Sequence, residues 1–165
     1  MTLNDNIIIL IVVYTTWEVN IINKIQKKHM QIVEEQPDYK AAIKLAAKPL
    51  IDDNLIESPY VDAVLKAIKD LGPYICLADD FALPHARPSE HVKETSLSLL
   101  IIKKGVDLEG NRVKVMVFLA AKDSLSHQKV LQKLANFLME PDNIQDLIKC
   151  NDVDEIDALL EERWN

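Results

Sequence analysis

The chain has 165 residues, of which 48% are hydrophobic and 27% charged, and its formal net charge is −7. This length and composition predict one globular domain with a full hydrophobic core. The negative charge argues against nucleic acid as a partner, because phosphate backbones require a basic surface, and it favours a basic docking partner. Two cysteines, Cys76 and Cys150, suggest neither a zinc site nor a disulfide framework, which fits a reducing cytoplasm.

An uninterrupted apolar run from Ile7 to Val13 marks an N-terminal extension, residues 1–20, of unknown role. The run is shorter than the ~20 residues that span a bilayer. It lacks a basic n-region and a clear cleavage site, so it is a poor signal peptide. We interpret it as a buried strand or helix and, as a hypothesis, as a homodimer contact. An unchanged mass by light scattering after deletion of residues 1–20 would contradict that contact.

Hydrophobic periodicity predicts the elements of the first half of the chain. Pro37 suits the first turn of a helix, and Pro49 should end or kink that helix because proline lacks an N–H group. Ser58 as N-cap, Pro59 at the first helical position and Gly72 beyond the end define the clearest helix. The predicted ranges are an amphipathic helix at 21–28, a strand at 30–34, a helix at 37–50 and a helix at 58–71.

The second half of the chain alternates apolar strands with helices. Gly105 and Gly110 mark a loop between the two best strands. The predicted strands cover 74–77, 81–83, 97–102 and 113–121, and three helices follow, at 124–138, 141–148 and 152–160. Apolar runs without strict alternation indicate strands covered on both faces. The predicted fold class is therefore an α/β three-layer sandwich, a central mixed β-sheet with helices on both faces.

The stretch 81–88 (FALPHARP) holds His85 between two prolines. Each proline fixes its own φ and restricts the residue before it, so the segment is stiff and holds its side chains in a set direction. A stiff segment suits a reacting histidine. The alternative is a strand-ending turn in which His85 is merely a polar surface residue.

The residues 83–88 (LPHARP) resemble the phosphorylation-site segment of the mannitol/fructose-type EIIA components of the bacterial sugar phosphotransferase system. A second anchor is 119–123 (LAAKD), followed by His127, and the resemblance runs from about Gln36 to Leu160. The segment 71–75 (LGPYI) is most similar to the ascorbate-type branch. The resemblance implies an EIIA type-2 domain over residues 21–165, with the same sandwich and with Nε2 of His85 as phosphoryl acceptor.

His127 is the expected second member of the site, for stabilisation of the phosphoryl group. It follows Asp123 in or near the first turn of a helix, where the helix dipole disfavours protonation and leaves N–H groups pointing outward. A neutral imidazole there can hydrogen-bond a phosphoryl oxygen without trapping it as a tight ion pair. The alternative is that His127 only caps the helix end.

Arg87 lies two residues from His85 and is expected to contact the phosphate or a partner protein, or else to be a plain solvated side chain. His91 is interpreted as a surface histidine, and His29 is assigned no role. Hydroxyl groups near the two segments belong to Ser89, Thr95 and Ser126.

The resemblance implies a cytoplasmic phosphoryl carrier. His85 would accept a phosphoryl group from the phosphohistidine of HPr and pass it to a cysteine of EIIB, which phosphorylates a sugar, of the ascorbate type, entering through a membrane EIIC. No metal or organic cofactor is expected. Both partners must reach one histidine, so we expect an apolar patch rimmed by charge around it. The candidates for the patch are Phe81, Leu83, Leu125 and Val92.

The alternative function is a regulatory module, in which phosphorylation of His85 controls a transporter or a transcription factor. Both functions need the same site, so the sequence does not separate them. A hydrolase using the two histidines lacks a plausible nucleophile or metal set.

Overall fold

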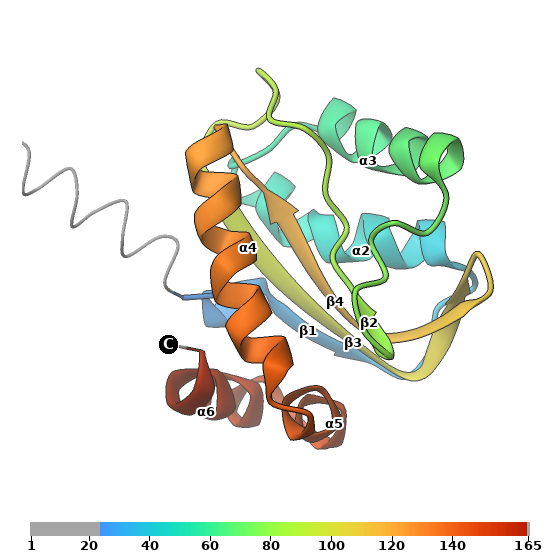
Figure 1. Cartoon of the computed structure of the whole chain (residues 1–165), viewed down its shortest axis with the longest axis vertical. Helices are drawn as coiled ribbons and strands as arrows, with labels where there is room; N and C mark the ends of the chain where they lie inside the picture. Colours follow the sequence, from blue (N-terminus) through green and yellow to red (C-terminus); the bar gives the residue numbers. More distant parts are fainter. Residues whose placement is uncertain (1–23, 165) are drawn as a thin grey trace, which may run out of the picture.

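The structure is a computed structural model that describes residues 24–164, so the apolar run and the domain boundary at residue 20 lie outside the described residues. Between residues 24 and 164 no helix is long and apolar enough to cross a membrane. The elements, shown in Figure 1, are η1 (Lys27–His29), β1 (Met30–Val33), α2 (Tyr39–Asp52), α3 (Ser58–Leu71), β2 (Asp80–Ala82), β3 (Ser96–Leu108), β4 (Asn111–Ala120), α4 (Ser124–Met139), α5 (Asp142–Lys149) and α6 (Val153–Arg163).

The four strands form one mixed sheet in the order β1-β3-β4-β2. β3 and β4 form an antiparallel hairpin, whose two turn residues Glu109 and Gly110 have φ of 51° and 91°. Positive φ at both central residues is typical of a type I′ turn. β1 pairs in parallel with β3, and β2 in parallel with β4. The carboxyl ends of β2 and β4 therefore meet at one edge of the sheet.

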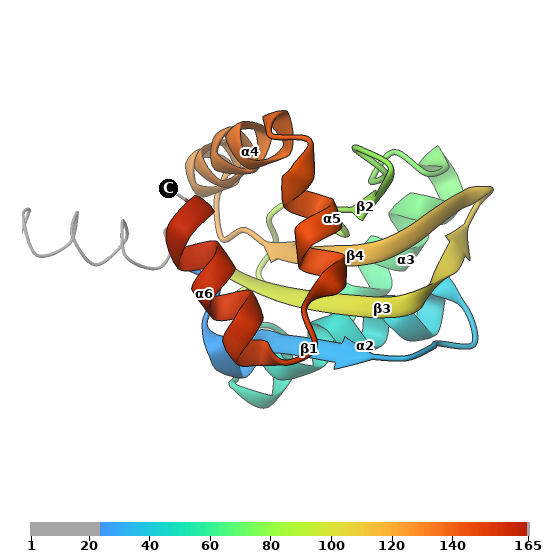
Figure 2. The ribbon, with the colours of Figure 1, turned by 90° about the horizontal axis from the view of Figure 1, so that it is seen from below.

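Side chains of β3 alternate between two hydrophobic cores on opposite faces of the sheet. Leu99 and Ile101 pack in one core with residues of α4, α5 and α6. Leu100 and Ile102 pack in the other with residues of α2 and α3. Figures 1 and 2 show the two groups of helices on opposite faces of the sheet. This arrangement confirms the predicted three-layer α/β sandwich and explains why the strands are apolar on both faces.

Three predicted ranges differ from the structure. The stretch 74–77 is a turn rather than a strand, because the N–H groups of Tyr74 and Cys76 bond back to the carbonyls of Gly72 and Pro73. The described part of the predicted helix at 21–28 contains only the beginning of the 3₁₀ turn η1. β3 continues through Gly105, with a register shift between Ile101 and Val106, so the hairpin loop is shorter than expected.

Pro49 does not end α2, because the helix continues for three more residues to Asp52. Proline cannot donate to the carbonyl four residues earlier, which is that of Leu45. Gln31 on β1 supplies the missing donor, since its Nε2 lies 2.8 Å from the Leu45 oxygen. At the other end of α2 the cap is Asp38, whose carboxylate accepts the N–H of Ala41 at 2.8 Å, so the helix begins after Pro37 rather than at it.

Candidate functional site

The two segments predicted to carry chemistry meet at the carboxyl edge of β2 and β4. His85 follows β2 by three residues, and His127 lies in the first turn of α4, which follows β4. The centroids of their imidazole rings are 5.2 Å apart. The carboxyl ends of strands in an open α/β sheet are where ligands commonly bind. The structure therefore brings together two histidines that are 42 positions apart in the sequence.

The hydrogen bond of His85 identifies its tautomer. Nδ1 of His85 lies 2.7 Å from the carbonyl oxygen of Leu83. A carbonyl oxygen only accepts, so Nδ1 carries the proton, and the lone pair of the neutral ring is on Nε2. This nitrogen is the one that the resemblance to known EIIA components implied as the acceptor.

The surroundings of His85 favour its neutral form. Burial lowers the pKa of His85 below its ordinary value, the carbonyl of Leu83 opposes this effect, and His127 adds a smaller lowering. The nucleophilic lone pair is therefore present at neutral pH. The Nε2 atom of His127 is buried and has no hydrogen-bond partner among residues 24–164. A buried polar atom without a partner is costly and commonly marks a functional position.

Two tyrosines hold the segment that carries His85. Tyr74 donates its hydroxyl proton to the carbonyl of His85, with 2.6 Å between the oxygens, and its ring packs edge-on against the His85 ring at 5.4 Å. The hydroxyl of Tyr60 on α3 accepts the N–H of Ala86 at 3.1 Å and lies 3.0 Å from the carbonyl oxygen of Leu119. Neither role was predicted from the sequence. Tyr60 shares a helix face with buried residues at i+4 and i+8, and a buried tyrosine hydroxyl needs a partner, so this spacing was the available signal.

The beginning of α4 differs from the expectation of free amide donors. Asp123 caps the helix, and its carboxylate accepts the N–H of Ser126 at 2.7 Å. This bond is the main cause that lowers the pKa of Asp123. The N–H of His127 bonds to the carbonyl of Asp123 at 3.1 Å. Neither of these two amides is free for a ligand, whereas the imidazole Nε2 of His127 has no partner within residues 24–164 and is a donor that this turn can offer.

Arg87 is exposed, and its guanidinium makes no hydrogen bond or ion pair within residues 24–164. It is therefore available to an incoming phosphoryl group or protein. Thr95 serves the fold, because its hydroxyl accepts the N–H of Lys122 at 3.0 Å. Ser89 accepts the N–H of His91 at 3.3 Å, and His91 in turn pairs with a carboxylate oxygen of Glu57 at 2.8 Å.

His29, to which no role was assigned, is buried, and its Nε2 lies 2.7 Å from a carboxylate oxygen of Asp53. Of the four residues predicted to form an apolar docking patch, only Leu125 is exposed. The other three side chains are buried in the hydrophobic cores, Phe81 and Leu83 in one and Val92 in the other.

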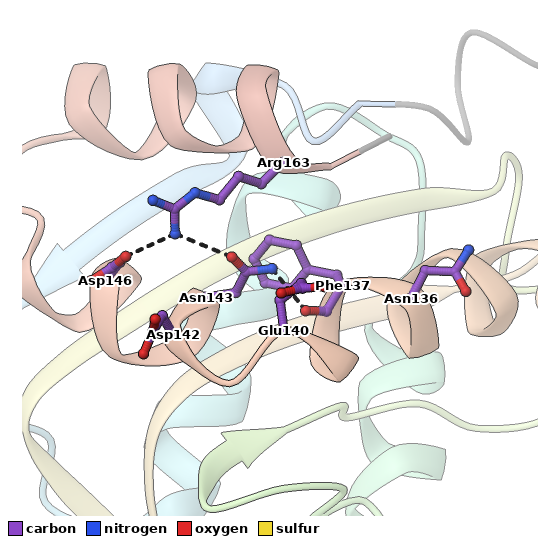
Figure 3. Close-up of a pocket in the computed structure, with 7 residues that line it drawn as sticks. All are labelled: Asn136, Phe137, Glu140, Asp142, Asn143, Asp146 and Arg163. Carbon is purple, nitrogen blue, oxygen red and sulfur yellow. Dashed lines mark hydrogen bonds and ion pairs between the residues drawn. The ribbon is translucent and has the colours of Figure 1, made fainter.

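The structure has another concavity, of about 410 Å³, among α4, α5 and α6 (Figure 3). Three of its polar side chains are joined by hydrogen bonds. Arg163 contacts the carboxylate of Asp146 at 2.8 Å and the amide oxygen of Asn143 at 3.1 Å, while the amide nitrogen of Asn143 donates to the carbonyl of Phe137 at 2.8 Å. The concavity lies at the C-terminal end of α4, and its nearest lining residue on this helix, Asn136, is about 14 Å along the axis from His127. It is therefore separate from the two histidines.

Comparisons with known proteins identify the family of the chain. Residues 23–163 match the family described as the phosphoenolpyruvate-dependent sugar phosphotransferase system, EIIA 2. The ascorbate-specific PTS system EIIA component of Escherichia coli (strain K12) is 28% identical over 140 residues, which cover 82% of this chain and 91% of that protein.

Solved structures show the same fold. The solution structure of the mannitol-specific cryptic phosphotransferase enzyme IIA CmtB from Escherichia coli is similar with a TM-score of 0.78 at 27% identity, over 84% of this chain and 95% of that one. The crystal structure of IIA mannitol from Escherichia coli gives a TM-score of 0.72 at 25% identity, over 83% and 99% of the two chains. Together with the family match, these likenesses identify the chain as a member of the EIIA 2 family of the sugar phosphotransferase system.

Proposed function

We propose that this chain carries a phosphoryl group on Nε2 of His85 between two partner proteins. The observation that carries the proposal is the hydrogen bond from Nδ1 of His85 to the carbonyl of Leu83 at 2.7 Å, which leaves the Nε2 lone pair as the nucleophile. Family membership supplies the reaction class, that of a phosphotransferase component.

The first step is attack of His85 Nε2 on the phosphorus of the phosphohistidine of HPr. A bond forms between Nε2 and phosphorus as the bond between phosphorus and the donor imidazole breaks, and the donor nitrogen recovers its lone pair. No proton has to leave His85, because Nε2 is already unprotonated. The buried Nε2 of His127, as an N–H donor, bonds an oxygen of the moving phosphoryl group.

In the second step a cysteine thiolate of an EIIB protein attacks the phosphorus, and the bond from phosphorus to His85 Nε2 breaks. Arg87 is exposed beside the site, where it can contact the phosphoryl group or the approaching partner. EIIB then phosphorylates a sugar that enters through a membrane EIIC. Similarity to ascorbate-specific EIIA components supports a sugar of the ascorbate type and a place of action in the cytoplasm, where these partners act.

The test is phosphoryl transfer from phosphoenolpyruvate, with enzyme I and HPr added, to wild type, His85→Ala and His91→Ala. We expect an acid-labile, base-stable label on wild type and on His91→Ala, and none on His85→Ala. His91 is the matched control, because it is also a loop histidine but pairs with Glu57.

A label that persists on His85→Ala would refute the proposed acceptor. A label on His85 that no EIIB cysteine removes would keep the acceptor and replace transport with the regulatory function.

A further inference from the structure

The segment 83–88 has no regular secondary structure. Main-chain groups at and beside His85 instead form hydrogen bonds with two tyrosine side chains and with strand β4. The carbonyl of Pro84 accepts the N–H of Leu119 at 3.0 Å. The carbonyl of His85 accepts the hydroxyl of Tyr74 at 2.6 Å. The N–H of Ala86 donates to the hydroxyl of Tyr60 at 3.1 Å. Three successive residues are thus each fixed by at least one hydrogen bond from outside the segment.

The proton of the Tyr60 hydroxyl has two acceptors, the carbonyl oxygens of Leu119 at 3.0 Å and of Ala86 at 3.1 Å. Through this hydroxyl, α3 connects the residue after His85 to the carboxyl end of β4. Tyr60 is fully buried, so its ring cannot move without repacking the core. The tie is therefore stiff.

We propose that Tyr60 and Tyr74 are positioning residues that fix the His85 main chain so that its ring keeps the Nδ1–H to Leu83 hydrogen bond and presents Nε2 as the acceptor. This inference rests on the proposed function. The hydroxyls of the two tyrosines bond main-chain groups of His85 and Ala86, not the reacting nitrogen.

The His85 ring is tied closely to its own main chain, which makes its orientation sensitive to the backbone. Nδ1 of His85 bonds to the carbonyl two residues earlier, so a rotation of the peptide planes at His85 or Ala86 moves the ring away from Leu83. Loss of that bond frees the second tautomer, in which Nε2 carries the proton and cannot attack. A misplacement of about 1 Å can cost about 10²-fold in rate.

Both hydroxyls keep their protons over the pH range in which histidine titrates. Burial raises the pKa of Tyr60 to about 12. Burial also raises the pKa of Tyr74. The two hydrogen bonds are therefore constant while the protonation of His85 changes, which is the property that a positioning group needs.

The experiment compares Tyr60→Phe, Tyr74→Phe and the double variant with wild type. Each substitution removes one hydroxyl and keeps the ring. Tyr39→Phe is the matched control, because the hydroxyl of Tyr39 donates to Glu109 at 3.1 Å, at the end of the β3–β4 hairpin far from His85. The readouts are kcat and KM with phospho-HPr as donor, the ¹⁵N chemical shifts of the His85 ring in the unphosphorylated protein, and the melting temperature.

We expect the double variant to lose about 10-fold or more in kcat with KM for phospho-HPr changed by less than about two-fold, since the docking surface is intact. The ¹⁵N shifts should show a mixture of the two His85 tautomers, where wild type has the proton on Nδ1. The control Tyr39→Phe should match wild type in all three readouts. Tyr74 is only half-buried, so Tyr74→Phe alone tests the inference if Tyr60→Phe does not fold.

A lower melting temperature with unchanged kcat and unchanged His85 shifts would overturn the inference, because it would show a structural role alone. The two proposals fail separately. An unlabelled wild type would refute the phosphoryl carrier, whereas a labelled wild type with fully active tyrosine variants would refute only the positioning role. The NMR readout needs no phosphoryl donor, so it tests the positioning role in either case.

Discussion

The imidazole of His85 has to be neutral to attack phosphorus, and three effects of different weight set its pKa. Burial is the largest and lowers the pKa of His85, because a charged ring loses its hydration. The bond to the carbonyl of Leu83 acts in the opposite direction, and the nearby His127 lowers the pKa further. The balance favours the neutral ring at and below neutral pH.

The rate of phosphoryl acceptance should therefore reach half of its maximum at a pH below about 6.5, the ordinary pKa of histidine. The sign follows from the lowered pKa, since the charged, unreactive form appears only when the pH falls through the folded-state value. Initial rates against pH, together with an NMR titration of His85, provide the measurement.

His127→Gln tests the causes of the lowered pKa. It should raise the pKa of His85 only slightly, because burial is the larger cause. A half-maximal rate at or above the ordinary histidine pKa in wild type would contradict this account of His85.

At the scale of the element, the first turn of α4 sets the position of the second histidine. Asp123 accepts the N–H of Ser126 at 2.7 Å, and α6 begins with the same motif, in which Asp152 accepts the N–H of Glu155 at 2.9 Å. Loss of an aspartate N-cap costs about 1 kcal/mol of stability, because a backbone donor of the first turn loses its partner. The two caps are chemically alike, but only one precedes a site residue.

Asp123→Ala and Asp152→Ala should lower the free energy of unfolding by similar amounts, about 1 kcal/mol each, as measured in urea. Only Asp123→Ala should slow phosphoryl transfer, since fraying of that turn displaces His127. Asp123→Ser retains a capping oxygen and should restore both stability and rate. Equal rates for the two alanine variants would mean that the placement of His127 does not depend on the cap.

The sequence predicted most elements correctly where periodicity and caps agree. The helix predicted over 58–71 has these bounds in the structure, although Glu57 rather than Ser58 is its N-cap, and α4 begins after Asp123 as predicted. Pro49 does not end α2, which was one of the two predicted outcomes, because Gln31, a residue distant in sequence, donates to the carbonyl that proline leaves without a donor. Local rules cannot supply such a partner.

The residues of the candidate site were likewise predictable only where a local sequence signal marks them. A motif indicated His85, and helix position indicated His127. The apolar stretch beginning at Tyr74 looked like a strand, because hydrophobicity predicts burial but does not show which N–H groups a turn has already used. The roles of Tyr60 and Tyr74 depend on tertiary contacts with the segment around His85, which only the fold reveals.

At the scale of the whole molecule, one sheet separates two hydrophobic cores, and both histidines lie at one end of it, where β2 and β4 finish. An exposed apolar side chain near this end is that of Leu125, two residues before His127, with 60% of its surface accessible. Met139 is 77% exposed at the other end of α4. Leu125 is therefore a candidate contact for a partner protein, and Met139, on the same helix but far from the histidines, is its control.

Leu125→Ser should raise KM for phospho-HPr about 10-fold, with kcat changed little, because an apolar contact in a docked complex contributes to binding rather than to the transfer step. Met139→Ser removes a similar exposed apolar side chain and should leave KM unchanged. Steady-state kinetics of both variants provide the comparison. Equal KM values for the two variants would place the docking surface elsewhere on the molecule.

The position of the phosphoryl group on the phosphorylated protein, measured by ¹⁵N and ³¹P NMR of the histidine ring, decides whether His85 is the carrier. We expect one phosphohistidine, His85, with phosphorus bonded to Nε2 and the proton retained on Nδ1, as the bond to the Leu83 carbonyl requires. Phosphorus on Nδ1, or on His127 instead, would contradict the proposed role of His85, because the structure gives the free lone pair to Nε2 of His85.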